Sequence, residues 1–181
     1  MPFVPLTWTS FRNTQASPEG NDLRKISGVS GAWDADAVSS EQIASASPGL
    51  GIQFGLWPLI VVAAGLSHDN PGASYEGVDY LIMAWGGDLP TTQIYENGIL
   101  VYDTGFPPPT VAVYSIIINA AGQIEYWFDD VLKHTSLLAP SFPLFAVGKM
   151  SDVNIFYRIY DAMIDAGVVA KIDHLPLLGV H

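Results

Sequence analysis

The sequence predicts an all-β domain, folded as an antiparallel two-sheet β-sandwich with an extended apolar arm at its C-terminus. Gly (17 residues) and Pro (13 residues) interrupt the chain at short intervals. Val, Ile, Tyr, Phe and Trp fill the segments between them, as in proteins built from many short strands. The expected strands are Leu6–Phe11, Asp22–Ile26, Ala35–Ile43, Gly51–Trp57, Leu59–Leu66, Val78–Trp85, Thr92–Glu96, Ile99–Asp103, Thr110–Asn119, Gln123–Phe128, Val131–Ser136, Leu144–Val147 and Val153–Tyr160.

Two turns connect neighbouring strands in this reading. Asn97-Gly98 stands between two apolar segments, and Asn-Gly tolerates the two positive φ angles of a type I′ hairpin. Asp129-Asp130 separates the expected strands Gln123–Phe128 and Val131–Ser136, and residues 120–122 form the turn before the first of these strands. These turns predict one hairpin and one three-stranded antiparallel meander.

Alternation of side chains assigns faces for some of these strands. In residues 123–128 every second residue is apolar and is expected to face the core, while Glu125 and Trp127 face outward. The apolar residues 60–62 and 116–118 do not alternate, so both faces of those strands are expected to be covered. A loop, the C-terminal arm or a second copy of the chain is the expected cover.

Length and composition limit the domain organisation and the partners. The 181 residues suit a single domain, with the sandwich expected over residues 1–160 and the apolar arm over residues 161–181. Gly167, Pro176 and Gly179 prevent one continuous helix in the arm, which is expected either to fold over its own sandwich or to dock on a neighbouring subunit. A formal net charge of −11 opposes binding to nucleic acid or to an anionic membrane.

The chain has no cysteine, so neither disulfides nor thiolate metal sites are expected. Residues 1–6 lack the basic and apolar pattern of a secretory signal. The apolar stretch 54–66 is shorter than the roughly 20 residues that a membrane-spanning helix needs. We therefore expect no membrane insertion, and a virion or an extracellular or cell-surface location without a recognisable signal peptide.

A series of short motifs carries a family resemblance over roughly residues 6–156. Taken in order with their spacing, these motifs resemble bacterial and phage lectin-like domains of the concanavalin A-like lectin/glucanase superfamily, including SPRY-type jelly rolls. The resemblance implies a jelly-roll fold more than an activity. The sequence departs from relatives at Asp129-Asp130, where Asn-Gly is usual, at Pro107–Pro109, and in the tail beyond residue 160. The motifs occupy residues 20–25, 32–35, 39–43, 65–67, 74–82, 95–98, 126–131 and 142–144.

The glucanases of this superfamily place catalytic carboxylates on one strand face in a Glu-x-Asp-x-Glu or similar pattern, which this sequence lacks. The nearest acidic group is Glu125 with Asp129 and Asp130, whose spacing across a hairpin end does not suit glycoside hydrolysis. The four histidines are scattered, and no Gly-x-Ser-x-Gly nucleophile motif accompanies them. The chain is therefore expected not to be an enzyme, with a glycoside hydrolase as the least favoured function.

Aromatic residues beside amide and carboxylate groups provide the candidate ligand site, because a sugar needs an apolar face to stack on and polar groups to read its hydroxyls. Trp33 and Tyr75 have an alternative role as core or corner residues. Asp34, Asp36, Asp69 and Asn70 offer oxygen ligands that suit calcium, but turn capping is favoured there, so no metal and no cofactor is expected. The candidate site residues are Trp33, Asp34, Asp36, His68, Asp69, Asn70, Tyr75 and Trp85.

The function expected from this sequence is a non-catalytic lectin-like carbohydrate-binding or adhesion module, on a phage particle or bacterial surface. The alternative is a structural assembly protein, such as a virion decoration or fibre component, that binds no ligand. The expected partners are a glycan or neighbouring protein subunits, in a homo-oligomer or a larger assembly. The apolar composition, with 49% hydrophobic residues, favours assembly, whereas the tryptophans expected in loops favour ligand binding.

Overall fold

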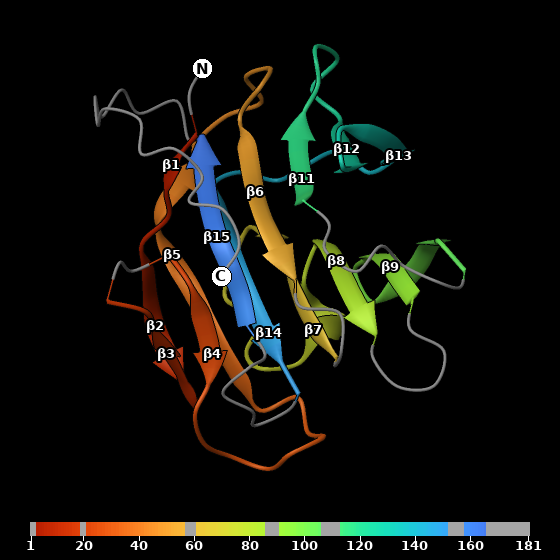
Figure 1. The fold of residues 1–181 in the computed structure, drawn as a ribbon. Helices are drawn as coiled ribbons and strands as arrows, with labels where there is room; N and C mark the ends of the chain where they lie inside the picture. The colour runs from red at the N-terminus through yellow and green to blue at the C-terminus, as the bar shows by residue number, and fades with distance from the viewer. Residues whose placement is uncertain are drawn as a thin grey trace.

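The computed structural model describes residues 3–18, 21–56, 61–85, 91–105, 113–151 and 158–165. The described elements are short strands and a single 3₁₀ turn, η1 (Tyr75–Gly77) (Figure 1). The strands are β1 (Val4–Pro5), β2 (Trp8–Arg12), β3 (Thr14–Ala16), β4 (Leu23–Lys25), β5 (Ala35–Ile43), β6 (Gly51–Leu56), β7 (Val62–Ser67), β8 (Tyr80–Trp85), β9 (Thr91–Glu96), β10 (Ile99–Asp103), β11 (Val113–Ile118), β12 (Ile124–Phe128), β13 (Val131–Thr135), β14 (Leu144–Met150) and β15 (Arg158–Asp165).

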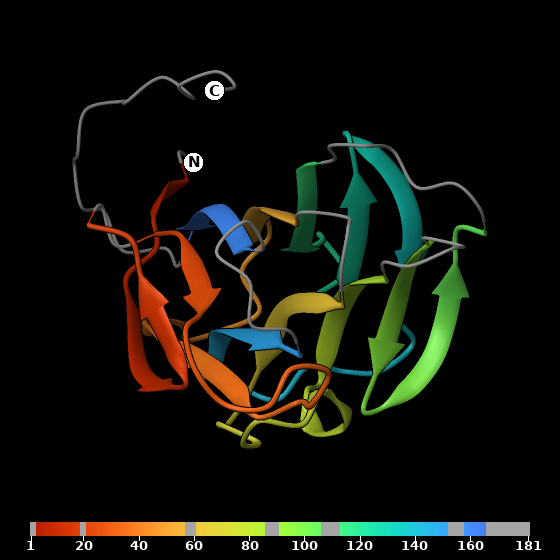
Figure 2. The same cartoon turned by 60° about the horizontal axis from the view of Figure 1, so that its bottom comes forward.

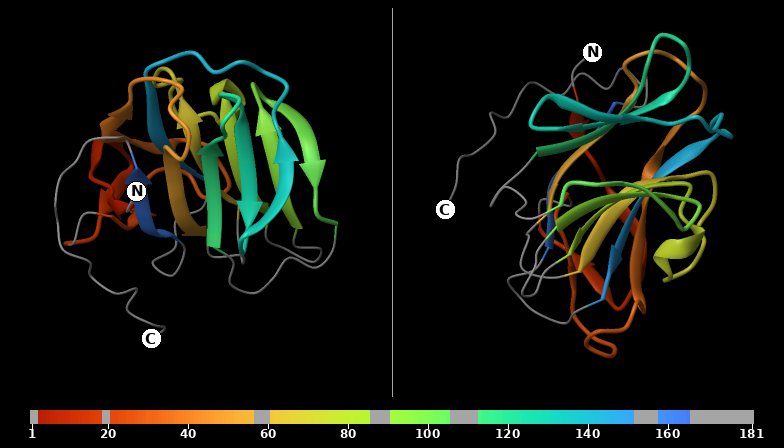
Figure 3. Two further views of the ribbon diagram at one scale, coloured as in Figure 1. Left: turned by 90° about the horizontal axis from the view of Figure 1, so that it is seen from above. Right: turned by 90° about the vertical axis from the view of Figure 1, so that its right-hand side faces the viewer.

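The strands form two antiparallel sheets that face each other. Sheet A has the order β13-β12-β11-β6-β15-β4-β3, with β1 pairing β15, and sheet B has the order β10-β9-β8-β7-β14-β5-β2. The two layers are separated in Figures 2 and 3, where β11 to β13 of sheet A lie over β7 to β9 of sheet B. The predicted all-β antiparallel sandwich is confirmed.

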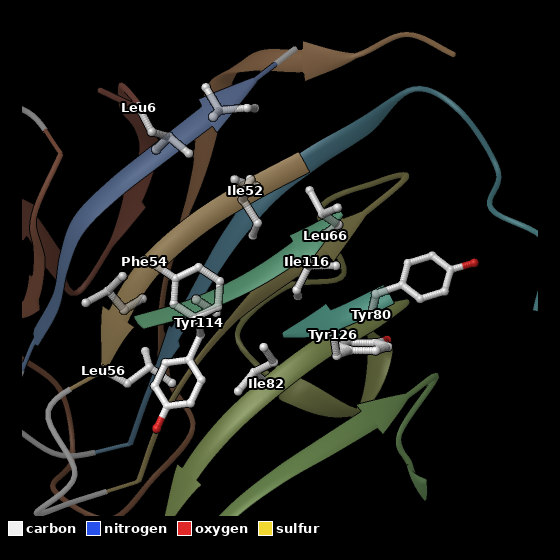
Figure 4. Packing of buried hydrophobic residues seen from close by; sticks show 14 of the residues in the cluster. Leu6, Ile52, Phe54, Leu56, Leu66, Tyr80, Ile82, Tyr114, Ile116 and Tyr126 are labelled. Atoms are coloured by element: carbon white, nitrogen blue, oxygen red, sulfur yellow. The ribbon is translucent and has the colours of Figure 1, made fainter. Parts of the chain in front are cut away.

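The main hydrophobic core lies between the two sheets (Figure 4). Ile124, Tyr126 and Phe128 are buried there, while Glu125 and Trp127 point away, as the alternation predicts. Sheet B contributes alternate residues in the same way, such as Ile82 on β8. Burying one side chain of this size stabilises the fold by roughly 1.5–3 kcal/mol relative to leaving it exposed.

The two predicted turns have the backbone that their sequences favour. Asn97 and Gly98 have φ angles of 49° and 75° between β9 and β10, and Asp129 and Asp130 have φ angles of 48° and 60° between β12 and β13. Two consecutive positive φ angles match the right-handed twist of a hairpin. At Gly98 a Cβ atom would also lie 2.9 Å from the Glu76 carbonyl oxygen, so the turn has little room for a side chain.

Sheet B also carries apolar side chains on its outer face, away from sheet A. A second hydrophobic cluster there includes Val38, Leu81, Met83 and Val147, with Val61 packed against it. The cover expected over residues 60–62 is provided at Val61 by this chain's own residues. On sheet A, Ile117 is half-buried between the buried Ile116 and Ile118.

The structure places two strands that the sequence did not predict and extends another. The short strands β1 and β3 were not expected. Strand β15 runs through the boundary expected at residues 160 and 161, because it pairs with β6 as far as Asp165. Residues 152–157 and 166–181, which include most of the last expected strand and most of the arm, lie outside the described residues. The division into sandwich and arm stays a prediction.

Among the described residues, no helix has the length and apolar character to cross a lipid bilayer. Residues 57–60, 86–90 and 106–112, which include Pro107–Pro109, also lie outside the described residues.

Candidate functional site

Strands β8 and β9 present alternate side chains on the outer face of sheet B. Leu81 and Met83 belong to the outer cluster, and Trp85 packs against it as the last residue of β8. The register pairs Leu81 with Tyr95 and Met83 with Gln93, so Tyr95 and Gln93 share this face. The outer face near β8 and β9 therefore combines aromatic, apolar and amide groups.

Two loops lie on this face of sheet B, as the orange and yellow-green segments at the bottom of Figure 2 show. The first covering segment, residues 26–34, connects β4 to β5, and the second covering segment, residues 68–79, connects β7 to β8. Tyr75 in the second segment contacts Trp33 in the first, with ring centroids 5.0 Å apart. Tyr75 also meets Tyr95 edge-on at 5.4 Å. The aromatic row Trp33, Tyr75 and Tyr95 thus joins both segments to the sheet.

Lys25, at the end of β4, fixes the first covering segment. Its side chain is 0% exposed and forms an ion pair with Asp34. The Lys25 ammonium donates to the carbonyl oxygens of Val29, Ala32 and Ser151 at 2.7, 3.0 and 2.8 Å. The Lys25 hydrogen bond, with the Val29 N–H, lowers the pKa of Asp34 below its ordinary value. A buried charge requires such partners, and here they tie three parts of the chain together.

Lys149, on β14, holds the second covering segment against the sheet. Its side chain is fully buried, its ammonium lies 3.4 Å from the Asp36 carboxylate, and it donates to the carbonyl of Gly72. The Arg12 guanidinium approaches the other Asp36 oxygen at 3.4 Å. Burial lowers the pKa of Lys149, and the nearby Asp36 charge opposes that shift.

The acidic residues considered for calcium are not gathered into one site. Asp34 pairs with Lys25, and Asp36 pairs with Lys149 and Arg12. Asn70 accepts the N–H of Gly72 at 3.2 Å, which is the turn-forming role of a side-chain amide. Within the described ranges, no three His, Asp or Glu side chains are grouped in a way that suits a metal ion.

His68 and Asp69 lie at the start of the second covering segment. Asp79 accepts from the His68 backbone N–H at 2.9 Å and lies 2.6 Å from the His68 Nδ1. This hydrogen bond, followed by the Asp79 charge, raises the pKa of His68, and Asp69 adds a smaller effect in the same direction. Because β7 and β8 are antiparallel, His68 after β7 and Trp85 at the end of β8 lie at opposite ends of the strand pair. Trp33, Tyr75 and Trp85 therefore pack against the same apolar cluster. His68 lies away from Trp85.

A polar group that the sequence reasoning missed adjoins this aromatic row on β9 and β10. The Tyr95 hydroxyl donates to the Gln93 Oε1 at 2.8 Å, and the Gln93 Nε2 donates to the Asp103 Oδ2 at 2.6 Å. The other Asp103 oxygen accepts from the Thr91 hydroxyl at 2.5 Å and from the Gly105 N–H at 2.8 Å. These hydrogen bonds, above all those from Thr91 and Gln93, lower the pKa of Asp103. We call these five residues the Asp103 network.

The sequence carried a usable signal for part of this network. The expected strand Thr92–Glu96 alternates, so Gln93 and Tyr95 had to share a face. What it did not reveal was which face, because that depends on the pairing of β9 with β8 and of β10 with β9.

Two carboxylates of the acidic group at residues 125, 129 and 130 have structural partners. Glu125 accepts from the Asn119 amide at 2.9 Å and from the Trp127 indole at 3.2 Å. Asp129 accepts the Val113 N–H at 2.8 Å, at the far end of β12. Both therefore stabilise local structure on sheet A.

Solved structures supply the comparison that identifies the fold. The chain is similar to the PSpry domain of TRIM65, at 12% identity over 90% of this chain and 92% of that one, with a TM-score of 0.59. It is also similar to the metal-free carbohydrate recognition domain of Emp46p, at 10% identity over 90% and 89% of the two chains, with a TM-score of 0.59. The fold is a concanavalin A-like jelly roll.

The same jelly roll occurs in an enzyme, the alginate lyase AlgAT5 of polysaccharide lyase family 7. Its identity to this chain is 14%, over 84% of this chain and 81% of that one, with a TM-score of 0.54. No protein-family model and no curated protein matches the sequence. Since this jelly roll serves binding domains and an enzyme, the activity must be argued from the site.

Proposed function

We propose that this jelly roll is a non-catalytic carbohydrate-binding domain, and that its ligand lies on the part of the outer face of sheet B formed by β8, β9 and β10. The observation that carries the proposal is the aromatic row ending at Tyr95, directly beside the hydrogen-bonded amide of Gln93. A pyranose ring has an apolar face and a rim of hydroxyls, and this surface offers a matching aromatic group and polar neighbours. Display on a phage particle or a bacterial surface belongs to the same proposal.

The site residues predicted from the sequence have different roles in this proposal. Trp85 is part-exposed on the proposed face and is a direct ligand contact. Tyr75 packs edge-on against Tyr95, and Trp33 packs against Tyr75. Asp34 and Asp36 keep the covering segments in place through the two buried lysines.

The remaining predicted residues follow β7, at the end of the β7–β8 pair opposite to Trp85. His68, Asp69 and Asn70 are exposed at the start of the second covering segment. We assign them contacts with the outer units of a longer glycan.

Binding without catalysis is supported by the chemistry of the face. On β8, Leu81 and Met83 are fully buried under the covering segments and Trp85 is part-exposed. In the Asp103 network the carboxylate is held by three donors. Glycoside hydrolysis requires two carboxyl groups facing each other across the sugar, roughly 5–9.5 Å apart, and the Asp103 network supplies one.

A glycan array tests the proposal. The wild-type domain is expected to bind a defined set of glycans, and Tyr95→Ala and Gln93→Ala are each expected to weaken the best of them about tenfold or more. Gln42→Ala is the matched control, because Gln42 is an exposed glutamine of β5 in the same sheet. An array with no bound glycan, or equal losses in Gln93→Ala and Gln42→Ala, argues against the proposed site.

One observation favours the assembly function as a second candidate. Ile99 and Leu100 on β10 are 68% and 45% exposed, and Val131 and Leu132 on β13 are 53% and 43% exposed. Strands β10 and β13 each end the described order of a sheet, and exposed apolar edges promote association. Light scattering of Ile99→Lys tests it: loss of an oligomer supports assembly at this edge, and an unchanged mass contradicts it.

A further inference from the structure

The Asp103 network has a fixed hydrogen-bond direction. An ionised carboxylate only accepts hydrogen bonds, so Gln93 must turn its N–H group to Asp103. The Gln93 oxygen then faces Tyr95, whose hydroxyl must donate to it. Thr91 and Gly105 also donate to Asp103.

This direction leaves the network rich in acceptors. The donor groups of Tyr95, Thr91 and Gly105 are engaged inside the network, as is one N–H of Gln93. The Asp103 Oδ2 accepts one hydrogen bond and keeps further acceptor capacity, whereas the Trp85 indole N–H already approaches the Tyr95 oxygen. A ligand must therefore supply the protons, as sugar hydroxyls and ammonium groups do. The single remaining N–H of Gln93 is too little to bind a carboxylate or sulfate.

The charges of the chain also disfavour a ligand that carries carboxylate or sulfate groups. Asp103 is exposed and its pKa is lowered by its hydrogen bonds to Thr91 and Gln93, so it is negative at neutral pH. Two cations, Lys149 and Arg12, lie in the cross-strand row of sheet B that contains Asp103. Both are paired with Asp36, and Lys149 is fully buried. The chain as a whole has a formal net charge of −11. An anionic ligand would meet like charge at short range and at long range.

We propose that the Asp103 network restricts this face to uncharged or cationic sugars and rejects sugars with carboxylate or sulfate groups. This inference rests on the proposed carbohydrate-binding function. It adds a specificity-determining residue, Asp103, and a ligand class.

The test compares wild type and Asp103→Asn on one array that carries neutral, amino and acidic glycans. Wild type is expected to bind neutral or amino glycans only. Asp103→Asn keeps the shape, adds a donor and removes the charge, so it is expected to gain about tenfold or more for acidic glycans. Asp130→Asn is the matched control, because Asp130 is an exposed aspartate in the β12–β13 hairpin of the other sheet, and it is expected to leave the binding pattern unchanged.

The outcomes separate this inference from the function on which it rests. Wild-type binding to neutral glycans with a gain for acidic ones in Asp103→Asn supports both. Three results overturn the selectivity but leave carbohydrate binding intact. Wild type binds acidic glycans, or Asp103→Asn gains no affinity for them, or Asp130→Asn gains as much affinity as Asp103→Asn. An array with no bound glycan overturns the proposed function itself. Thermal unfolding of Asp103→Asn serves as the folding check, and if that variant is unfolded, Asp103→Ser takes its place.

Discussion

Replacing Lys25 by Met tests how the first covering segment is held on sheet B. The Met side chain fills a similar volume but removes the ammonium. The Asp34 Oδ1 and three carbonyl oxygens then lose Lys25 as donor, while the Asp34 Oδ2 keeps the Val29 N–H. Removing one partner of a buried ion pair typically costs roughly 3–5 kcal/mol. The Asp34 side chain is 31% exposed, but its Oδ1, which pairs with Lys25, is buried, and so is Ser151. We therefore expect a loss of at least about 3 kcal/mol.

Urea unfolding followed by circular dichroism measures this loss in the free energy of unfolding. In thermal unfolding of a chain of this length, a loss of about 3 kcal/mol lowers Tm by roughly 6–12 °C. Arg24→Met is the matched control, because Arg24 precedes Lys25 on β4 and is exposed, and it is expected to change stability by less than about 0.5 kcal/mol. A loss below about 1 kcal/mol in Lys25→Met, or equal losses in the two variants, would refute the role assigned to Lys25.

Two further predictions concern the core and the pH dependence. Ile82→Ala, in the core between the sheets, is expected to cost roughly 2–5 kcal/mol in denaturant unfolding, whereas Leu137→Ala at a 92% exposed position is expected to cost less than about 0.5 kcal/mol; similar losses would contradict the assigned core. The raised pKa of His68 beside Asp79 means that the folded state binds its proton more tightly, so the stabilisation is fully present below the ordinary pKa of about 6.5 and is lost as pH rises through the raised value. The stability difference between wild type and His68→Gln is therefore expected to be larger at pH 5.5 than at pH 9, and a difference that grows with pH would contradict the pairing.

The sequence predicted those features of the fold that depend on local chemistry. Asn97-Gly98 and Asp129-Asp130 form turns because their backbones accept positive φ angles. The alternation in β12 buries Tyr126 and exposes Trp127 to the outer side because successive side chains point to opposite faces. These features need no knowledge of distant residues.

The features that the sequence did not predict depend on contacts between distant segments. Lys25 is buried because Ser151, far along the chain, supplies one of its acceptors, and no local pattern marks a lysine for burial. Asp103 meets Gln93 through the pairing of β10 with β9. Strand β15 continues to Asp165 because β6 and β1 pair with it there. The sequence predicts a loop at Trp33, but the contact of Trp33 with Tyr75 depends on two distant loops that meet.

Backbone amide NMR during titration with the best glycan from the array tests the central claim most directly. If the outer face of sheet B binds the ligand, the largest shifts will fall on residues 91–95 and 103–105 and on the Trp85 indole, with smaller ones at Tyr75. Shifts concentrated on the outer face of sheet A around Trp127, with residues 91–105 unmoved, would contradict it.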